Sequence, residues 1–269
     1  MHAPPRARLR APRGRVNAMD GPSAARGRPG PPERAPLVSV IVPTWNEAKC
    51  LPALLESLRA QARPPVEILV ADSGSTDGTQ ELARAKGAIV LEGERKGPGE
   101  GRNRGARAAR GDLLVFVDAD CIVPRDLIEA IVAAADASDV VGGATGFVPA
   151  QGTLAERALF LLANGYQRAL TLWGYPHNAG FCFFFRRSAF EALGGIRDEM
   201  LLNETHDIAL RSRTLGRFVI LPQRVQTSMR RFRTYGYLRT ILKEYIASTV
   251  LFYATGRTPS DRFRPQPAR

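Results

Sequence analysis

Residues 112–120 read DLLVFVDAD, an apolar run that ends in two aspartates. Such a run predicts a buried strand, and the ligands of a parallel sheet bind beyond the carboxyl ends of its strands. Asp118 and Asp120 lie two residues apart, so on an extended chain both carboxylates point to the same side. Two such oxygen anions suit Mg²⁺ or Mn²⁺ holding a diphosphate, and the alternative is a pair of solvated loop aspartates. The first interpretation predicts a metal site at Asp118 and Asp120.

Short apolar runs alternate with helical patterns on both sides of this segment. Residues 51–58, for example, carry four leucines at the spacing of one apolar helix face. The alternation predicts an α/β fold, in which helices flank a Rossmann-like, mostly parallel sheet in a single domain. The expected strands are residues 38–42, 66–71, 88–91, 112–117, 140–148 and 180–186, and the expected helices are residues 51–58, 100–110, 154–172, 204–215 and 235–254.

The charge of the chain is concentrated at its ends. The 269 residues carry a net charge of +12, yet residues 1–36 hold 8 Arg against 2 acids and residues 222–269 hold 10 Lys and Arg against 2 acids. The body between them is close to neutral, so it offers no basic face for nucleic acid. With 44% hydrophobic and 24% charged residues, the chain is long enough for a sizeable core and too polar for an integral membrane bundle.

The cysteines and the N-terminus indicate the compartment. Cys50, Cys121 and Cys182 are far apart and lack metal-ligand spacing, which predicts reduced thiols in a cytoplasmic protein. Residues 1–36 lack the apolar stretch of a secretory signal and predict a disordered tail. The basic helix expected over residues 235–254 has one apolar side, so it either packs on the domain or lies on the inner face of the membrane, making the protein peripheral.

Four segments occur in a fixed order between residues 43 and 121: PTWNE at 43–47, DSGSTDGT at 72–79, KGPGEGRNRGARAARG at 96–111 and DADC at 118–121. In this order they resemble the nucleotide-binding half of the family 2 glycosyltransferases, whose pattern reads PxxNE, D(D/S)GSxD, ARNxG and DxD. The resemblance covers about residues 37–234 and implies the GT-A fold. It divides the chain into a tail over residues 1–36, a glycosyltransferase domain over 37–234 and a C-terminal helix and tail over 235–269. The domain would consist of a nucleotide-binding half, 37–121, and an acceptor half, 122–234.

The resemblance implies roles for individual residues around the donor. Pro43, Thr44 and Glu47 would line the nucleoside pocket, and Asp72 would meet the base or ribose. The expected nucleotide-binding residues are Pro43, Thr44, Glu47, Asp72, Arg102, Asp118, Arg230 and Arg231. Arg230 and Arg231 would neutralise the leaving diphosphate, and the alternative for them is a solvated basic loop. Arg104, Arg107 and Arg110 are expected on a solvated helix face.

The acceptor half contains NETHDIALR at 203–211, which resembles the family's EDxDLxLR with Thr205 in place of an aspartate. Glu204 and Asp207 lie three residues apart on one helical face, so either is a candidate for the catalytic base, and Asp207 is slightly favoured. His206 is a third candidate because its intrinsic pKa is near neutral. The plain alternative is a helix cap with surface residues.

The resemblance implies an inverting, metal-dependent glycosyltransferase that uses Mg²⁺ or Mn²⁺. It would move a sugar from a nucleotide-diphosphate sugar to a hydroxyl or lipid-phosphate acceptor in cell-surface glycan or glycolipid synthesis. Two alternatives are a sugar-phosphate nucleotidyltransferase, with KGPGEGRNRG as its glycine-rich loop, and a non-catalytic nucleotide- or membrane-binding relative. The retained DxD pattern argues against the last of these.

Overall fold

The computed structural model of the chain describes residues 35–200, 202–236 and 252. These residues belong to one compact unit, Glu33–Arg269, and form an eight-stranded sheet with helices around it. The strands are β1 (Val38–Thr44), β2 (Glu67–Asp72), β3 (Ile89–Glu92), β4 (Leu113–Val117), β5 (Cys121–Ile122), β6 (Val140–Pro149), β7 (Cys182–Arg186) and β8 (Arg217–Thr227). The helices are α1 (Leu51–Arg59), α2 (Thr79–Ala85), α3 (Pro98–Ala108), α4 (Leu127–Ala135), α5 (Leu154–Leu172), α6 (Arg187–Ala192), α7 (Glu204–Arg211), the 3₁₀ turn η1 (Ser212–Thr214) and α8 (Arg230–Tyr235).

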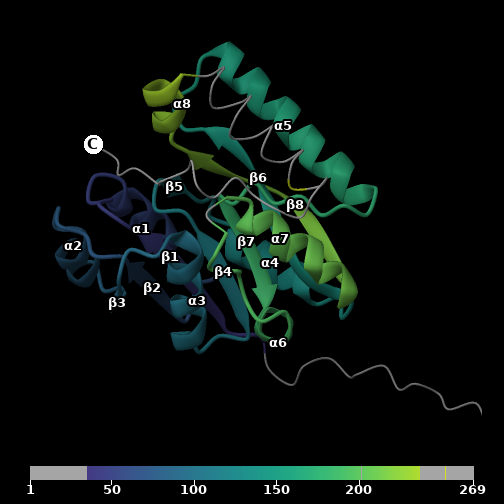
Figure 1. The fold of residues 1–269 in the computed structure, drawn as a ribbon, viewed down its shortest axis with the longest axis horizontal. Helices are drawn as coiled ribbons and strands as arrows, with labels where there is room; N and C mark the ends of the chain where they lie inside the picture. Colours follow the sequence, from purple (N-terminus) through teal and green to yellow (C-terminus); the bar gives the residue numbers. More distant parts are fainter. Residues whose placement is uncertain (1–34, 201, 237–251, 253–269) are drawn as a thin grey trace, which may run out of the picture. The chain divides into compact units, whose positions relative to one another are not determined.

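The strand order is β3-β2-β1-β4-β7-β6-β8-β5 (Figure 1). The four strands from β3 to β4 run parallel, whereas β7 is antiparallel to both of its neighbours. Beyond β7, β6 and β8 pair in parallel, and the short β5 closes the edge in antiparallel pairing. The expected α/β class with a mostly parallel, helix-flanked sheet is therefore confirmed. The parallel half brings the carboxyl ends of β1, β2 and β4 to one edge.

Each face of the sheet has its own hydrophobic core. Val38, Val40 and Val42 of β1 pack in one core with α1 and α4 residues, while Ile41 belongs to the other core, which includes α3, α6 and α7 residues. This alternation is the two-residue period of a strand. The leucines expected on the apolar face of α1 are all fully buried. Helices on both faces explain why the central strands are apolar throughout rather than alternating.

The structure corrects several expected elements. The helix expected over residues 204–215 ends at Arg211 and continues as the 3₁₀ turn η1. Strand β8, which contains Pro222, was not expected from the sequence pattern. Its register with β6 shifts between the Ala144–Ile220 and Gly146–Arg224 pairs, and a proline is tolerated at such an irregularity because no ladder hydrogen bond is required there.

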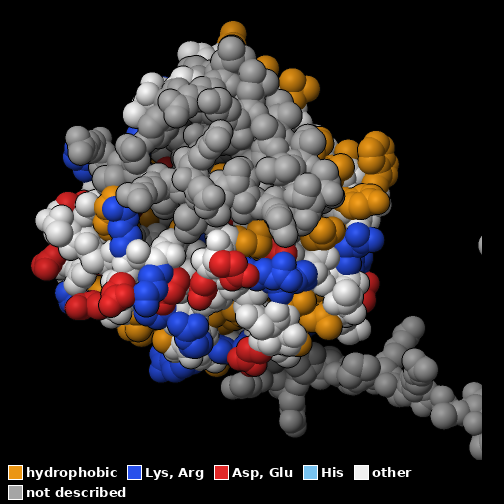
Figure 2. Space-filling view, in the orientation of Figure 1, with side chains coloured by type: hydrophobic (Ala, Val, Ile, Leu, Met, Phe, Trp, Pro, Cys, Tyr) orange, Lys and Arg blue, Asp and Glu red, His pale blue; other side chains and the backbone are white. Residues whose placement is uncertain are grey.

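Helix α5 covers the sheet beside β6 and exposes an apolar surface. Exposed hydrophobic side chains gather over this helix, at the upper right of Figure 2. A Thr153 capping box with Glu156 starts the helix: Thr153 Oγ1 accepts from the Glu156 backbone, and Glu156 Oε2 accepts from the Thr153 backbone. Its bounds match the prediction.

The predictions for the two ends of the chain are not tested by the structure. Residues 1–34 and most of the helix expected at 235–254 lie outside the described residues. The division at residues 36 and 234 therefore stays a prediction. Among the described residues, none of the helices combines the length and the hydropathy needed to cross a bilayer.

The approach of α3 to β1 requires a glycine, and this can be tested. A Cβ at Gly105 would overlap Cγ2 of the buried Ile41, so Gly105→Ala should lower the free energy of unfolding by about 1–3 kcal/mol. Urea unfolding followed by circular dichroism measures this. Gly165→Ala in α5 is the matched control, since nothing lies within 4 Å of its Cβ position and alanine should raise stability by about 0.5–1 kcal/mol. Equal effects at the two positions would contradict the packing argument.

Candidate functional site

The candidate site lies where β1, β2 and β4 end. The register pairs Thr44 with Asp72, the last residues of β1 and β2, and Asp118 follows the last residue of β4. This is the edge at which the sequence predicted a ligand. The structure thus brings three segments together that are more than 25 residues apart in the chain.

Asp72 is fully buried and organises the loop that follows β2. Its Oδ1 accepts from the Ser75 backbone at 2.9 Å and from Gln80 Nε2 at 2.7 Å, and its Oδ2 accepts from Thr44 Oγ1 at 2.9 Å. Burial alone would raise the pKa of Asp72, but these hydrogen bonds, led by those from Ser75, hold it below its usual value. The carboxylate therefore stays ionised and fixes the loop, while its expected contact with base or ribose stays a prediction.

Arg104 also contacts this loop, which corrects the expectation of a solvated helix face. Its Nη2 donates to the carbonyl of Asp72 at 2.8 Å, and its Nη1 pairs with Glu100. Arg107 and Arg110 have largely exposed side chains, as expected, although Arg110 pairs with the buried carboxylate of Glu67. No sequence pattern separates Arg104 from Arg107 and Arg110, because the three arginines recur at helical spacing.

A second group of charges surrounds Arg230, at the start of α8. Its Nη2 donates to Glu47 Oε1 at 3.1 Å and lies 4.0 Å from Asp120 Oδ2. Burial raises the pKa of Glu47, and the Arg230 guanidinium opposes that effect. Arg230 and Asp120 line a pocket of about 410 Å³ together with Ser228. The structure thus brings Glu47, Asp120 and Arg230 together as expected, whereas the side chain of Arg231 lies outside the described part of the structure.

Arg102 links the end of β4 to α7. Its Nη2 donates to Asp118 Oδ1 at 2.7 Å, and its Nη1 donates to Glu204 Oε1 at 2.8 Å. The guanidinium is only 4% exposed, and although burial would lower its pKa, the two carboxylates raise it. A buried charge needs such partners, because removing one leaves an uncompensated ion at a cost of about 3–5 kcal/mol.

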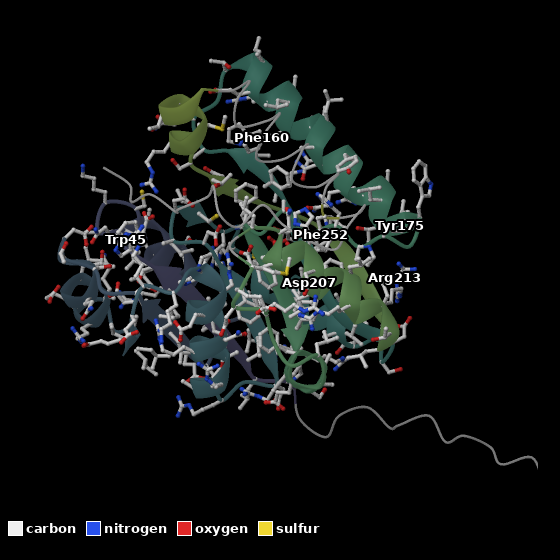
Figure 3. The ribbon with its side chains drawn as sticks, in the orientation of Figure 1. Trp45, Phe160, Tyr175, Asp207, Arg213 and Phe252 are labelled. Atoms are coloured by element: carbon white, nitrogen blue, oxygen red, sulfur yellow. The ribbon has the colours of Figure 1, made fainter. Side chains whose placement is uncertain are left out.

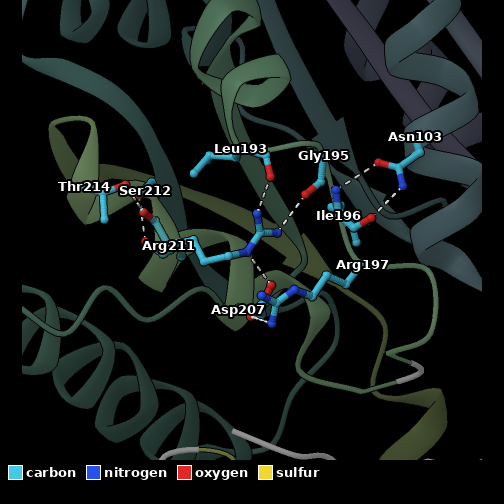
Figure 4. Close-up of polar contacts among 10 residues, drawn as sticks. Asn103, Leu193, Gly195, Ile196, Arg197, Asp207, Arg211, Ser212 and Thr214 are labelled. Carbon is cyan, nitrogen blue, oxygen red and sulfur yellow. Dashed lines mark hydrogen bonds and ion pairs between the residues drawn. The ribbon is translucent and has the colours of Figure 1, made fainter.

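Asp207 belongs to a different network (Figure 4). Its Oδ1 accepts from Arg197 at 3.0 Å and its Oδ2 from Arg211 at 2.7 Å. Arg211 also donates to the carbonyls of Leu193 and Gly195, so Asp207 helps to fix the segment between α6 and α7. Both oxygens of Asp207 are thus engaged away from Asp118, and in the described structure it is Glu204 that joins the Asp118 network.

Thr205 and two histidines form a buried polar cluster behind Glu204. Thr205 Oγ1 donates to the carbonyl of Asn178 at 3.1 Å. His206 Nε2 and His177 Nε2 are 2.9 Å apart, and their rings meet edge to face. Burial lowers the pKa of His177 to about 4 and that of His206 well below its usual value. The lowered pKa makes His206 a weak base, and its Nε2 is engaged by His177, so His206 is poorly suited to the role of catalytic base. The sequence did not reveal this partner.

Asp118 and Asp120 offer hard oxygen ligands for a divalent cation, but residues 119–120 form a turn, so the extended chain expected to point both carboxylates to one side is not present. Their side chains are 33% and 23% exposed, and the Arg102 contact engages Oδ1 of Asp118, so the other oxygen can face a ligand. Within the described ranges there is no cluster of three or more His, Cys, Asp or Glu side chains positioned to hold an ion. A cation here would take further ligands from phosphate oxygens and water, which is how Mg²⁺ commonly binds.

Trp45 makes a ring contact that the sequence motifs do not indicate. It lies in the loop after β1 (Figure 3), and the Arg95 guanidinium lies 3.4 Å from its ring centroid. This stacking ties the segment before α3 to the loop that carries Glu47. No periodic pattern in the sequence pairs these two positions.

Comparison with known proteins gives one family. The family model described as glycosyl transferase family 2 matches residues 39–194. Glycosyltransferase AglE of Haloferax volcanii is 38% identical over 133 residues, which cover 45% of this chain and 44% of AglE. The succinoglycan biosynthesis protein ExoA of Rhizobium meliloti is 30% identical over 186 residues, 64% of this chain and 56% of ExoA. The chain therefore spans less than two thirds of the length of these relatives.

Solved structures agree on the fold. The mannosyltransferase PcManGT from Pyrobaculum calidifontis, solved with GDP-Man and Mn²⁺, has a TM-score of 0.62 at 26% identity and is matched over 85% of this chain and 67% of its own. Glucosyl-3-phosphoglycerate synthase from Mycobacterium tuberculosis, solved with Mn²⁺ and UDP, has a TM-score of 0.54 at 22% identity over 80% of this chain and 79% of its own. Both likenesses support the expected GT-A fold.

The buried histidine pair should make stability depend on pH. In the unfolded chain the histidines take up protons below about pH 6.5, whereas folded His177 does so only near pH 4, so acid within this window favours unfolding. We expect the free energy of unfolding to fall by about 1–3 kcal/mol between pH 7.5 and 5.5, measured by urea unfolding. His177→Asn should reduce this dependence but not abolish it, because burial still lowers the pKa of His206. Equal stability of the native chain at both pH values would contradict the assignment.

Proposed function

Because the chain belongs to glycosyl transferase family 2, we propose that it moves a sugar from a nucleoside-diphosphate sugar to a hydroxyl or lipid-phosphate acceptor, with inversion at the anomeric carbon. The observation that carries this proposal is the Arg102 bridge, which sets Glu204 beside the Asp118 carboxylate. A carboxylate pair for the leaving group and a third carboxylate for the acceptor are the groups that a single displacement requires. A role in cell-surface glycan or glycolipid synthesis is part of the proposal, supported by the name of ExoA.

The donor would bind at the edge formed by β1, β2 and β4. Thr44, Glu47 and the loop held by Asp72 form the nucleoside side of this edge. Arg230, which lies 4.0 Å from Asp120 Oδ2, would contact the diphosphate. Pro43, in β1, would complete the nucleoside side, and Arg231 follows Arg230 in α8.

Asp118 and Asp120 would hold Mg²⁺ or Mn²⁺. The bound cation would neutralise charge on the leaving diphosphate. PcManGT, a relative in fold, is solved with GDP-Man and Mn²⁺, which supports a divalent metal and a nucleotide-sugar donor for this chain. The carboxylate oxygens of Asp118 and Asp120 are of the ligand type that such an ion prefers, which supports the proposal.

We favour Glu204 over Asp207 as the base. Glu204 uses Oε1 for Arg102, which leaves Oε2 for an acceptor hydroxyl, whereas Arg197 and Arg211 engage both oxygens of Asp207. Glu204 would take the proton as the hydroxyl oxygen attacks the anomeric carbon and the bond to the diphosphate oxygen breaks. Arg102 acts as a positioning residue for Glu204. A lipid-phosphate acceptor would need no such proton transfer.

The nucleotidyltransferase alternative gains no support from the fold. Most of the segment KGPGEGRNRG, residues 96–105, lies in α3 and packs against β1. A glycine-rich phosphate loop would instead follow the first strand. The motif therefore serves the approach of a helix to the sheet.

The metal proposal predicts a cation-dependent gain in stability. With a matching donor at 100 times its dissociation constant and Mn²⁺ present, the free energy of unfolding should rise by about 2.7 kcal/mol. A thermal-shift panel of UDP, GDP, CDP and dTDP sugars, with and without Mn²⁺, measures this and identifies the base. Asp120→Asn should abolish the metal-dependent shift, and Asp136→Asn, an exposed position after α4, should leave it intact. A full shift in the Asp120 variant would overturn the metal assignment.

The base assignment predicts different outcomes at two carboxylates. With water as the acceptor, Glu204→Gln should lower the rate of donor hydrolysis by about 10²–10⁴-fold. It should lower stability as well, because glutamine leaves the buried Arg102 with one carboxylate partner. Asp207→Asn should chiefly lower stability, because it loosens the Arg197 and Arg211 contacts. Hydrolysis rates and urea unfolding of both variants separate the two effects. A native rate in the Glu204 variant would move the base elsewhere.

A further inference from the structure

Helix α5 is turned with its polar side inward. Its buried residues are Glu156, Asn164, Gln167 and a single apolar one, Phe160, whereas Leu154 and Leu172 are each 85% exposed. A surface helix normally does the opposite, with its apolar stripe toward the core. This reversed orientation of α5 needs a physical cause. It also implies that something other than water contacts the exposed apolar side of the helix.

Hydrogen bonds to β6 fix this orientation. Asn164 Oδ1 accepts from the Phe147 backbone at 3.0 Å, and its Nδ2 donates to the Phe147 carbonyl at 2.7 Å. Gln167 Nε2 donates to the Thr145 carbonyl at 3.0 Å. Rotation of α5 to bury its leucines would break these bonds and leave buried amides without partners, at a cost of about 1–3 kcal/mol for each. The helix therefore holds its apolar side outward.

The exposed apolar residues form one continuous stripe, which we call the α5 outer face. Among the described residues, no large hydrophobic side chain outside residues 154–175 is more than 45% exposed, whereas Leu162 and Trp173 are 71% and 76% exposed. Figure 2 shows these hydrophobic side chains together over α5. At helical spacing they share one side, which carries no charged residue. The α5 outer face consists of Leu154, Ala155, Ala158, Leu161, Leu162, Gly165, Tyr166, Leu172 and Trp173.

Exposed charges beside this face are basic. Arg157 and Arg168 are eleven residues apart, about three helical turns, so they lie along the same edge of the stripe. Beyond the end of the helix, the Arg213 guanidinium lies 5.2 Å from the Tyr175 ring centroid, and Figure 3 shows both side chains there. The single acidic residue of α5, Glu156, is buried and lies 3.6 Å from Arg233.

The arginines beside the α5 outer face indicate which kind of partner binds there. A second copy of the chain on the same face would bring arginine edges together without acidic partners, which is unfavourable. An anionic lipid surface is complementary to them, since arginines beside an apolar stripe keep their charges among the headgroups. Tyr166, Trp173 and Tyr175 are also the residue types enriched at membrane interfaces.

We propose that the α5 outer face docks on an anionic lipid bilayer, with α5 lying in the plane of the interface. This contact is independent of the transfer activity proposed above. It also lies on a different element from the C-terminal helix for which the sequence suggested membrane contact. The leucines and Trp173 enter the interface, and Arg157 and Arg168 stay at the headgroups.

Flotation of the full chain with vesicles of equal phosphatidylglycerol and phosphatidylcholine tests the proposal. Leu162→Gln and Trp173→Gln should each lower the partition coefficient about tenfold or more, because each removes an inserted apolar side chain. Arg168→Gln should lower it about fivefold. Ile89→Gln, at an exposed apolar position on β3, is the matched control and should bind like the native chain. Native binding by the Leu162 and Trp173 variants would overturn the proposal, as would equal binding to pure phosphatidylcholine.

Fluorescence gives a second readout of insertion. The chain has 2 tryptophans, so in a Trp45→Phe background the emission reports on Trp173 alone. Anionic vesicles should shift this emission to shorter wavelength, and unchanged emission would overturn the proposal. Sedimentation velocity without lipid distinguishes self-association: a dimer that Leu162→Gln dissociates, in a chain that does not bind vesicles, would assign the face to a second copy instead.

Discussion

The buried guanidinium of Arg102 is the interaction on which the site depends. It lies between Asp118, which follows β4, and Glu204, which begins α7, and these carboxylates are 86 residues apart in the chain. An arginine that is 4% exposed is tolerated only with such partners. The same contact therefore holds the end of β4 and the start of α7 together. A change that moves α7 would disturb Glu204 and Asp118 together.

The path of the backbone makes this contact possible. Gly105 lets α3 approach Ile41 of β1, and this approach brings Arg102, one turn earlier in the helix, to the edge where β4 ends. Asp72 and Arg104 then fix the loop after β2 through hydrogen bonds and an arginine-to-carbonyl contact. The glycine-rich segment before β4 thus acts through packing, and its arginines act through the position that this packing gives them.

The sequence predicted those features that depend on interactions between residues close together in the chain. The strand expected over residues 38–42, the leucine face of α1 and the bounds of α5 follow from periodicity, and the positions of Asp72 and Asp118 at strand ends follow from strand direction. The separation of Glu204 from Asp207 into different networks was not predictable, because it depends on Arg197 and Arg211 beyond the motif. The pairing of His206 with His177 and the bend of β8 around Pro222 are likewise set by tertiary contacts. Periodicity also identified the helical pattern of α5 without revealing that its polar side is buried.

Thr205 stands where the family pattern has an aspartate, and its hydroxyl donates to the carbonyl of Asn178. A carboxylate only accepts hydrogen bonds, so an aspartate in this conformation would face that carbonyl with like partial charge. Thr205 thus ties the start of α7 to the segment before β7 by a hydrogen bond that an aspartate would not make in the same conformation. At this position the chain has a structural contact in place of an acidic group.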